Sequence, residues 1–362
     1  MSKIAVLGAG MVGRTIAVDL CNQGHEITSF DISQNNLNTL LNFDSSIKIN
    51  LVDFTAMNYE NGLASFDLVV SAVPGFIGYR VLKNIIEGAK KDCIDISFFP
   101  EDFTPLHQSA IENRVMAIVD CGVAPGMSNL ILGYESLKRN IIDFKFYVGG
   151  IPQERTLPFE YKAPFSPIDV IEEYTRPVRM RTNGNDIVVE PLTDIEHIEV
   201  TDVGTLEGFN TDGLRSLLTS FPDIPNMSEK TLRYPGYADK IKLLKQMGFF
   251  KYPHINHTAD VLKEAWLMKP EDKDITYMKV EIVDTKNKMI TYDMIDYHDG
   301  EFSSMSRTTA YTCTAIVNLF LNRHIKQFGV YPPEYIGQSM SNFNYIINYL
   351  HDKNVKWTCY EI

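Results

Sequence analysis

The stretch that decides the fold is the N-terminal run KIAVLGAGMVG, residues 3–13. Its first five residues form a short apolar segment, which is typical of a strand buried on both faces of a parallel sheet. The glycines that follow form a GxGxxG motif and lead into an amphipathic helical pattern that ends at Gly24. A second strand, Glu26 to Phe30, then ends in Asp31. The chain therefore opens with a strand, a glycine-rich turn, a helix, a strand and an acidic residue.

Each position of the motif has a physical task in binding a dinucleotide. Gly8 permits the tight turn, Gly10 lets the backbone approach a pyrophosphate, and Gly13 lets the helix pack closely on the strand. Met11 and Val12 open the helix, whose free N–H groups and positive dipole favour phosphate. In this context the motif predicts a dinucleotide site.

Asp31 stands 18 positions after Gly13, where a carboxylate can accept hydrogen bonds from both ribose hydroxyls. The same charge repels a 2′-phosphate, and Ile32-Ser33-Gln34-Asn35 supplies no Arg or Lys to hold one. The sequence therefore favours NAD over NADP.

The front third continues as strands alternating with amphipathic stretches, which predicts an α/β fold with a doubly wound parallel sheet and a ligand at its carboxyl edge. The predicted strands after the second are Ile47–Val52, Phe66–Val73, Cys93–Ile96 and Val115–Val119, and the helical stretches are Val81–Ala89 and Leu106–Asn113. Strand ends at this edge predict cofactor contacts for Asp53, Ala72, Val73 and Pro74, although Pro74-Gly75 also suits a simple turn.

After residue 122 the pattern changes to an α+β block, which predicts a mixed sheet covered by helices. Helices are expected at Gly126–Leu137, from Ser166-Pro167 onward, at Gly213–Leu218, at Thr308–Leu321 and after Tyr331. Strands are expected at Phe144–Val148, Ile187–Glu190, Ile195–Val200, Met278–Val283 and Ile290–Asp296.

Composition excludes several classes of function. The 362 residues carry 34 Lys+Arg against 46 Asp+Glu, a net charge of −12, so nucleic acid and anionic membranes are poor partners. No apolar run reaches the ~18 residues of a membrane span, and the start of the chain does not read as a signal peptide. Five scattered cysteines without CxxC pairs, and histidines without metal spacing, favour a reducing cytoplasm and catalysis without metal.

Three later segments carry a family resemblance. They are Asp120–Met127 (DCGVAPGM), Val148–Pro152 (VGGIP) and Lys230–Tyr237 (KTLRYPGY). Together with the N-terminal motif, and with Ala310–Thr312 and Gly329–Glu334, they resemble the saccharopine dehydrogenase-like family, and within it most of all the L-lysine 6-dehydrogenase branch. Ala124 and Val148 depart from the saccharopine reductase pattern, which has aspartate and cysteine there, and Tyr237 departs from the lysine 6-dehydrogenase pattern.

The resemblance implies a Rossmann domain over residues 1–122, a substrate and dimerisation domain over 123–307, and a segment 308–362 that packs back on the first domain. It also implies a homodimer. Catalytic candidates are Asp120, which ends a strand at the ligand edge, and Glu160 and Tyr161, which match the family pattern. The alternative for Asp120 is a helix-capping or loop carboxylate, and the alternative for Glu160 is a solvated strand end.

Three residues are candidates for substrate binding. Arg233 offers a planar fork for a carboxylate, with a surface ion pair as the alternative. Thr211 can hydrogen-bond substrate or cap the helix predicted after it. Lys240 lies on the helix after the third segment.

Three functions remain open from the sequence. The leading hypothesis is an NAD-dependent dehydrogenase that oxidatively deaminates an L-lysine-like amino acid. The alternatives are a saccharopine-type reductase that joins an amine to an oxo acid, and a non-catalytic NAD-binding protein.

Overall fold

The structure is a computed structural model that describes residues 1–56, 59–163, 167–269, 271–325 and 327–362. The chain divides into two compact units. Unit 1 comprises Met1–Tyr134 and Ser306–Asn354, and unit 2 comprises Glu135–Met305 and Val355–Ile362. In the described residues, every helix falls short of the length and apolar character that a bilayer crossing requires. The same residues contain no group of three or more His, Cys, Asp or Glu side chains placed to hold a metal ion.

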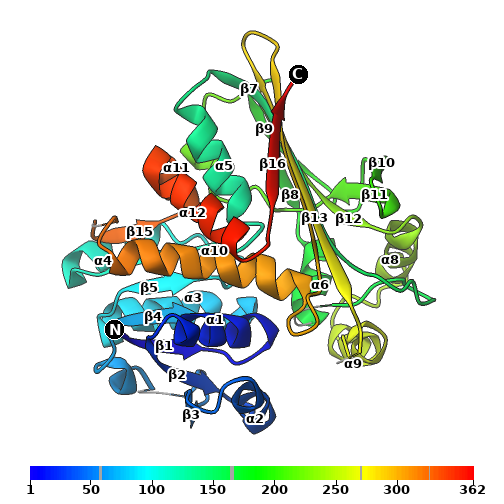
Figure 1. The fold of residues 1–362 in the computed structure, drawn as a ribbon. Coiled ribbons are helices and arrows are strands. Elements are labelled where there is room, and N and C mark those ends of the chain that lie inside the picture. Colours follow the sequence, from blue (N-terminus) through cyan, green and yellow to red (C-terminus); the bar gives the residue numbers. More distant parts are fainter. Residues whose placement is uncertain (57–58, 164–166, 270, 326) are drawn as a thin grey trace. The chain divides into compact units, whose positions relative to one another are not determined.

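Unit 1 is built on a wholly parallel sheet in the order β15-β6-β5-β4-β1-β2-β3 (Figure 1). Between β1 and β4 the order reverses, and a parallel α/β sheet binds its ligand outside the carboxyl ends of the strands at such a point. The strands are β1 Lys3–Leu7, β2 Glu26–Asp31, β3 Lys48–Leu51, β4 Leu68–Ser71, β5 Cys93–Asp95, β6 Met116–Ile118 and β15 Gly329–Tyr331. The doubly wound sheet predicted from the sequence is confirmed.

The helices of unit 1 connect and cover these strands. One continuous apolar core joins strands β1, β4, β5 and β6 to α3, η2 and α4 through residues such as Val69, Leu82, Ile86 and Leu106. The helical elements are α1 Met11–Asn22, α2 Gln34–Phe43, η1 Tyr59–Leu63, α3 Gly75–Asn84, η2 Ile85–Ala89, α4 Pro105–Asn113, α5 Met127–Ser136, α10 Ser304–Leu321, α11 Pro333–Gly337 and α12 Met340–Asp352.

The late helices are tied to the first helix of the chain by a buried carboxylate. Asp19 of α1 accepts hydrogen bonds from Thr314 Oγ1 of α10 at 2.7 Å and from Tyr349 Oη of α12 at 2.5 Å, and Lys353 Nζ pairs with it. An ion pair out of water is stabilising only when its remaining partners are satisfied, as they are here. The C-terminal helices therefore support the helix that begins at the glycine motif.

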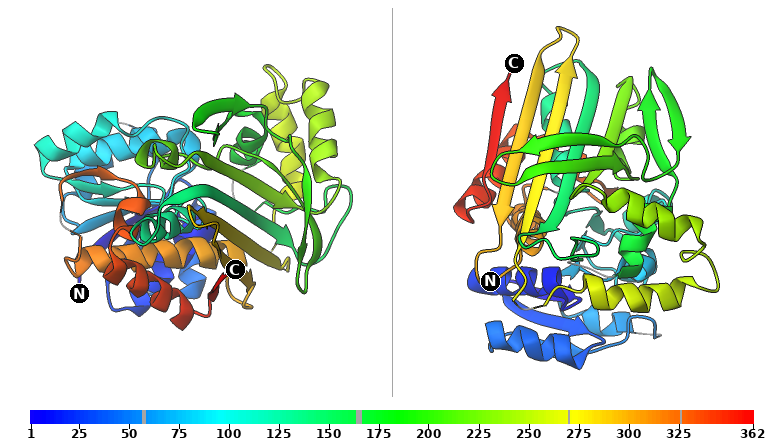
Figure 2. Two further views of the ribbon diagram at one scale, coloured as in Figure 1. Left: turned by 90° about the horizontal axis from the view of Figure 1, so that it is seen from above. Right: turned by 90° about the vertical axis from the view of Figure 1, so that its right-hand side faces the viewer.

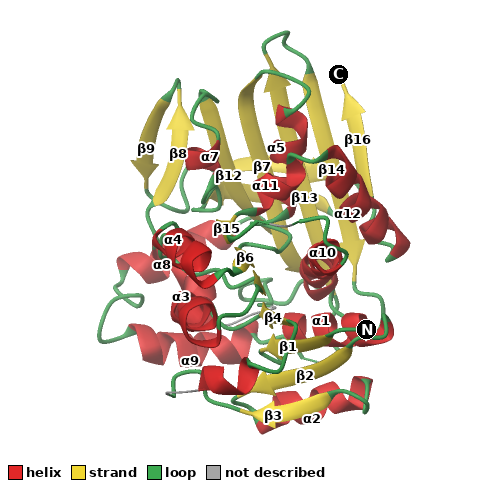
Figure 3. Ribbon diagram, turned by 90° about the vertical axis from the view of Figure 1, so that its left-hand side faces the viewer, coloured by secondary structure: helices red, strands yellow, loops and turns green. Residues whose placement is uncertain are grey.

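Unit 2 is built on a mixed sheet in the order β10-β11-β12-β7-β13-β14-β16, with the β8–β9 hairpin pairing to β12 (Figures 2 and 3). The β7–β12 pair is parallel and the others are antiparallel. The strands are β7 Ile141–Pro152, β8 Val178–Thr182, β9 Asn185–Val189, β10 Glu196–Val200, β11 Gly204–Asn210, β12 Asn226–Arg233, β13 Asp274–Asp284, β14 Met289–Tyr297 and β16 Trp357–Glu361.

The helices of unit 2 are α6 Pro167–Thr175, α7 Leu217–Ser220, α8 Tyr237–Gln246 and α9 Ile255–Trp266. An aromatic-rich core joins α6, α8 and α9 to the sheet through Tyr174, Phe209, Tyr237 and Trp266. Glu207 of β11 sets the start of α8, because its carboxylate accepts the N–H groups of Gly236 and Ala238 at 2.7 and 2.6 Å. A carboxylate at a helix N-terminus satisfies free donors and favours the helix dipole.

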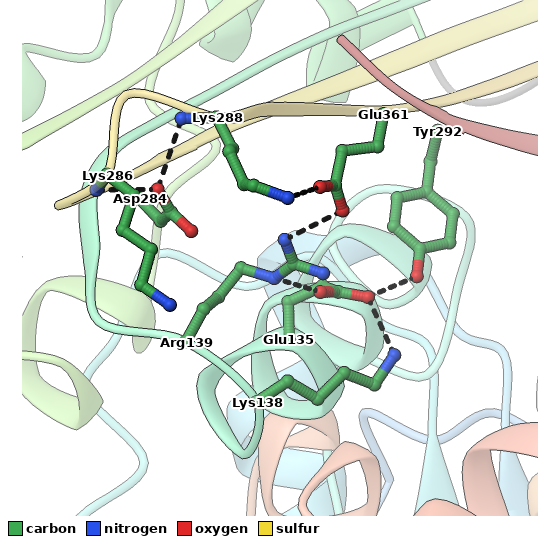
Figure 4. A network of polar contacts seen from close by, with 8 residues as sticks. All are labelled: Glu135, Lys138, Arg139, Asp284, Lys286, Lys288, Tyr292 and Glu361. Atoms are coloured by element: carbon green, nitrogen blue, oxygen red, sulfur yellow. Dashed lines mark hydrogen bonds and ion pairs between the residues drawn. The ribbon is translucent and has the colours of Figure 1, made fainter.

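The C-terminal strand β16 is fastened to unit 2 by a network of charges (Figure 4). Glu135, almost completely buried, accepts a hydrogen bond from Tyr292 Oη at 2.5 Å and pairs with Lys138 and Arg139 at 3.1 and 2.7 Å. Arg139 continues to Glu361 of β16 at 3.4 Å. The strand that closes the sheet is thus held by side chains as well as by its pairing with β14.

The starts of two helices of unit 2, α7 and α6, can be compared with the sequence-based predictions. The helix predicted at Gly213–Leu218 is wrong, since the helix begins at Leu217 and the side chains expected to cap it have other partners. For the other helix the sequence predicts a start at Pro167 with Ser166 as its N-cap; it does start at Pro167, and Ser166 itself lies outside the described residues.

Candidate functional site

The glycine motif forms a turn that only glycine can make at two positions. Gly8 has φ +100°, and a Cβ built on it would lie 2.4 Å from the Ala72 carbonyl oxygen. A Cβ on Gly13 would lie 2.1 Å from the Gly8 carbonyl oxygen. A Cβ on Gly10, by contrast, would meet no atom within 4 Å. The turn therefore packs against β4 on one side and leaves space beside Gly10.

Helix α1 begins at this space. Gly10 is its N-cap, and no side chain of the described residues caps the first turn, so the N–H groups at Met11 and Val12 have no side-chain acceptor. A helix N-terminus of this kind suits a phosphate, because free donors and the helix dipole act together. The open side of Gly10 provides room for that group.

Asp31, only 8% exposed, is held against the turn. Its Oδ2 accepts the Ala9 N–H at 2.6 Å and its Oδ1 accepts the Ser33 N–H at 2.7 Å. The carboxylate of Asp31 is thereby oriented at the end of β2. Arg14 of α1 places its guanidinium over the Phe43 ring at 5.2 Å.

The other predicted cofactor residues end neighbouring strands. Ala72 N–H bonds the Leu7 carbonyl at 2.8 Å, Val73 is buried, and exposed Pro74 is the N-cap of α3. Asp53 follows β3 on the surface, where its carboxylate accepts hydrogen bonds from Thr55 at 2.7 and 2.6 Å. The glycine turn, Asp31 and Ala72 are therefore brought together.

Asp120 follows β6 and is 1% exposed, with a left-handed φ of +57°. On the adjacent strand, fully buried Asp95 accepts hydrogen bonds from Ser97 Oγ at 2.7 Å and Ser97 N–H at 3.1 Å. The Cys121 N–H bonds the Asp95 carbonyl at 3.0 Å and joins the two strand ends. Burial raises the pKa of Asp95 to about 7, and the nearby Asp120 adds to the rise.

Sequence reasoning did not select Asp95. The signal that identifies it is the one applied to Asp120, an acidic residue at the carboxyl end of a parallel strand.

In unit 2 the predicted anchor Arg233 is 4% exposed and surrounded by tyrosines. Its guanidinium lies 4.5 Å above the Tyr161 ring, and Nη2 is 3.2 Å from Tyr174 Oη and 3.4 Å from Glu173 Oε2. Nη1 donates to the Leu232 carbonyl at 2.8 Å. Nε has no hydrogen-bond partner among the residues that the structure describes. The Nε–Nη2 edge, which binds carboxylates in a two-pronged manner, is thus only partly occupied.

In a second arginine, Arg179, both donors of the Nε–Nη2 edge are paired with a carboxylate. Arg179 donates from Nε and Nη2 to the two carboxylate oxygens of Asp212 at 3.0 and 2.8 Å. Asp212 is therefore used in an ion pair, which is one reason it does not cap a helix at Gly213.

Thr211 is buried and committed to another side chain. Its Oγ1 lies 2.9 and 2.7 Å from the two carboxylate oxygens of Glu229 and 2.7 Å from Thr231 Oγ1. Burial raises the pKa of Glu229 to about 8. The predicted capping role of Thr211 is wrong because its hydroxyl serves this buried acid.

The remaining candidates form a separate ion-pair group within unit 2. Glu160 accepts a hydrogen bond from Arg155 Nε at 2.8 Å and lies 3.8 Å from Lys240 Nζ. Tyr161, the next residue, instead packs in the aromatic core against Arg233. The structure therefore places Tyr161 with Arg233, and Glu160 with Lys240.

The fold and the site define a protein with a Rossmann dinucleotide-binding unit and a second, mixed-sheet unit that carries a buried arginine. Residues 4–118 match the family model of the saccharopine dehydrogenase NADP binding domain, and residues 122–355 match that of the saccharopine dehydrogenase C-terminal domain. The chain belongs to the saccharopine dehydrogenase family of oxidoreductases, as the resemblance implied.

The chain is also similar to two saccharopine dehydrogenases. The chain is 24% identical over 285 residues to saccharopine dehydrogenase [NADP(+), L-glutamate-forming] of Pyricularia oryzae, covering 73% of this chain and 60% of that protein's length. It shares its fold with an L-Glu-forming saccharopine dehydrogenase from Saccharomyces cerevisiae, at a TM-score of 0.80 and 17% identity over the whole of both chains.

Proposed function

We propose that the protein is an NAD-dependent dehydrogenase that oxidises the CH–NH₂ group of an L-lysine-like amino acid. Loss of hydride would give an iminium, water would hydrolyse the iminium to a semialdehyde with release of ammonia, and the semialdehyde would cyclise to an imine. Family membership supports an oxidoreductase acting on a C–N bond, and the departures at Ala124 and Val148 favour this reaction over saccharopine formation.

The proposal of a carboxylate-bearing substrate is based on the partly occupied Nε–Nη2 edge of the Arg233 guanidinium. Among the described residues Nε of this buried guanidinium has no hydrogen-bond partner, and an unsatisfied buried donor costs about 1–3 kcal/mol unless a ligand completes it. A substrate carboxylate fits that edge in geometry and charge. The aromatic rings of Tyr161 and Tyr237 keep water from the guanidinium and strengthen the interaction.

The nicotinamide ring, when bound, accepts the hydride. An amine must be neutral before hydride leaves its carbon, and the carboxylate of Asp120 is our candidate to take that proton. Asp95, at the end of the adjacent strand β5, is a second buried acid, and its carboxylate is held by Ser97 Oγ.

Cofactor choice is proposed from Asp31, although the family model and the fungal relative carry NADP in their names. A 2′-phosphate beside an oriented, 8% exposed carboxylate would bring two negative charges together. We expect NADH to bind at least ~30-fold more tightly than NADPH, which corresponds to about 2 kcal/mol. Fluorescence titration with both cofactors measures this, and equal dissociation constants would show that Asp31 does not face the ribose.

The second candidate is the reaction named for the fungal relative, an L-glutamate-forming saccharopine dehydrogenase. A panel of amino acids with NAD, and of amine and oxo-acid pairs with NADH, followed by absorbance, separates the two candidates. Turnover with L-lysine alone supports the first, and turnover only with saccharopine or its precursors supports the second. No turnover with any substrate would favour a non-catalytic NAD-binding protein.

By family likeness we propose a homodimer in a reducing cytoplasm. The five cysteines are free thiols, which suits that compartment. Light scattering of the purified protein tests the dimer.

A further inference from the structure

Arg233 is already accompanied by a carboxylate before any substrate binds. Glu173 of α6 places Oε2 at 3.4 Å from Nη2, on the edge that a substrate carboxylate would need. The contact is longer than the 2.8 Å seen between Arg179 and Asp212. Glu173 therefore neutralises Arg233 without completing its hydrogen bonds.

The surroundings of Glu173 offer little other compensation for its charge. From β12 it faces Arg233 and the acidic Glu229, and from its own helix Arg176 and Asp169. Arg176 is itself paired with Glu172 at 2.8 Å. Helix α8 contributes Tyr237 to the same core, and α9 contributes Ala259, Leu262 and Trp266.

We propose that Glu173 is a resident counter-ion of Arg233, which a substrate carboxylate replaces, and that the displaced Glu173 takes up one proton as substrate binds. The inference rests on the proposed function of Arg233. Two ionised carboxylates cannot share one buried guanidinium without repulsion, so the one that gives up the hydrogen bond becomes neutral. The charge of the cluster then stays constant, since one carboxylate and one proton enter together.

The direction of the pH dependence follows from this exchange. Burial raises the pKa of Glu173 to about 7, and Arg233 opposes the rise. Below that pH Glu173 is already neutral, and substrate binds without taking up a proton. Above it each binding event must bring one proton, so the apparent affinity should fall by up to ~10-fold per pH unit.

Isothermal titration calorimetry of the full chain counts these protons directly. The ligands are hexanoate with saturating NAD, which has no amine to oxidise or titrate, and L-lysine with NADH, so that no oxidation follows. Titrations in phosphate and in Tris, whose ionisation enthalpies differ, give the number of protons taken up. We expect ~0.9 proton at pH 8 and ~0.2 at pH 6.4.

Substitution identifies the group that titrates. Glu173→Gln imitates the neutral side chain, so we expect no proton uptake and an affinity at pH 8 close to that of the native protein at pH 6. Glu172→Gln is the matched control, because Glu172 is the adjacent residue and pairs with Arg176. Uptake in that variant should remain as in the native protein.

The outcomes separate this inference from the function on which it rests. If neither ligand binds, or if Arg233→Lys leaves binding unchanged, Arg233 is not the anchor and both ideas fail. If binding depends on Arg233 but brings no proton at pH 8, the inference alone fails. Uptake that persists in Glu173→Gln and disappears in Glu229→Gln would also overturn it and assign the proton to Glu229.

Discussion

Single residues in this protein differ in how fully their hydrogen bonds are satisfied. Asp31 has its two oxygens oriented by backbone N–H groups, and Arg179 has its fork filled by Asp212. Arg233 is buried, and its Nε finds no hydrogen-bond partner in the part of the chain that the structure describes. Buried polar groups without a hydrogen-bond partner are rare unless a ligand or strain explains them. Two single residues therefore have testable roles, namely Arg233 as the proposed carboxylate anchor and Asp120 as the proposed proton acceptor.

Replacing Arg233 with Lys keeps the charge but removes the planar fork. We expect the apparent substrate constant to rise ~10-fold or more while NAD affinity is unchanged, because charge-assisted hydrogen bonds contribute ~1.5–3 kcal/mol. Steady-state kinetics measures the change. Arg179→Lys is the control, and it should alter the substrate constant less than ~2-fold. Equal effects in both variants would count against Arg233 as the anchor.

Asp120→Asn removes the proposed proton acceptor and keeps the shape. Asparagine tolerates the left-handed φ of +57° at this position, so the backbone should be retained. We expect a folded protein that binds NAD but turns over ~10²–10⁴-fold more slowly. Near-normal turnover would show that Asp120 is only a loop carboxylate, and failure to fold would show that its role is structural.

At the scale of elements, short strands are held by partners far away in the sequence. Strand β15 has three residues and joins the parallel sheet at its edge by pairing with β6. Strand β16 pairs with β14 and is secured by the network around Glu135 (Figure 4). Neither strand is stable alone, because a few backbone hydrogen bonds do not offset the entropy of ordering.

The Glu135 network predicts a difference between a buried and an exposed carboxylate. Glu135→Gln should lower the free energy of unfolding by ~1–3 kcal/mol, because buried charge-assisted bonds to Tyr292, Lys138 and Arg139 are lost. Glu361→Gln, at a residue whose side chain is 42% exposed, should cost less than ~1 kcal/mol. Urea denaturation compares the two variants, and equal losses would mean that the burial of Glu135 contributes nothing.

For the whole molecule, buried acids give stability an unusual dependence on pH. Burial raises the pKa values of Asp95 and Glu173 to about 7 and of Glu229 to about 8. Between the unfolded pKa and these values the native protein holds more protons than the unfolded chain. The free energy of unfolding therefore decreases as pH rises from 5 to 8, by up to ~1.4 kcal/mol per pH unit for each group.

Melting temperatures measured from pH 5 to 8 test this expectation. We expect a maximum near the acidic end and a steady decrease toward pH 8. Glu229→Gln should flatten the profile by the contribution of one group. A melting temperature that stays level or rises toward pH 8 would show that these acids are ionised at little cost.

Local sequence determined the dinucleotide-binding half of the protein. The glycine turn, the helix start at Met11 and Asp31 all lie within 31 residues, where spacing alone places each group. Backbone sterics at Gly8 and Gly13 allow no alternative residue, which is why the motif is readable without a structure.

Tertiary structure alone decided the arrangement of side chains around Arg233. Tyr161, Glu173 and Arg233 come from a loop, a helix and a strand, and their contact depends on packing that no local pattern encodes. The helix expected at Gly213 does not form for the same reason. Thr211 and Asp212, the side chains expected to cap it, bind Glu229 and Arg179 of other strands. Burial, which sets the charge of Glu173 and Glu229, likewise exists only once the chain has folded.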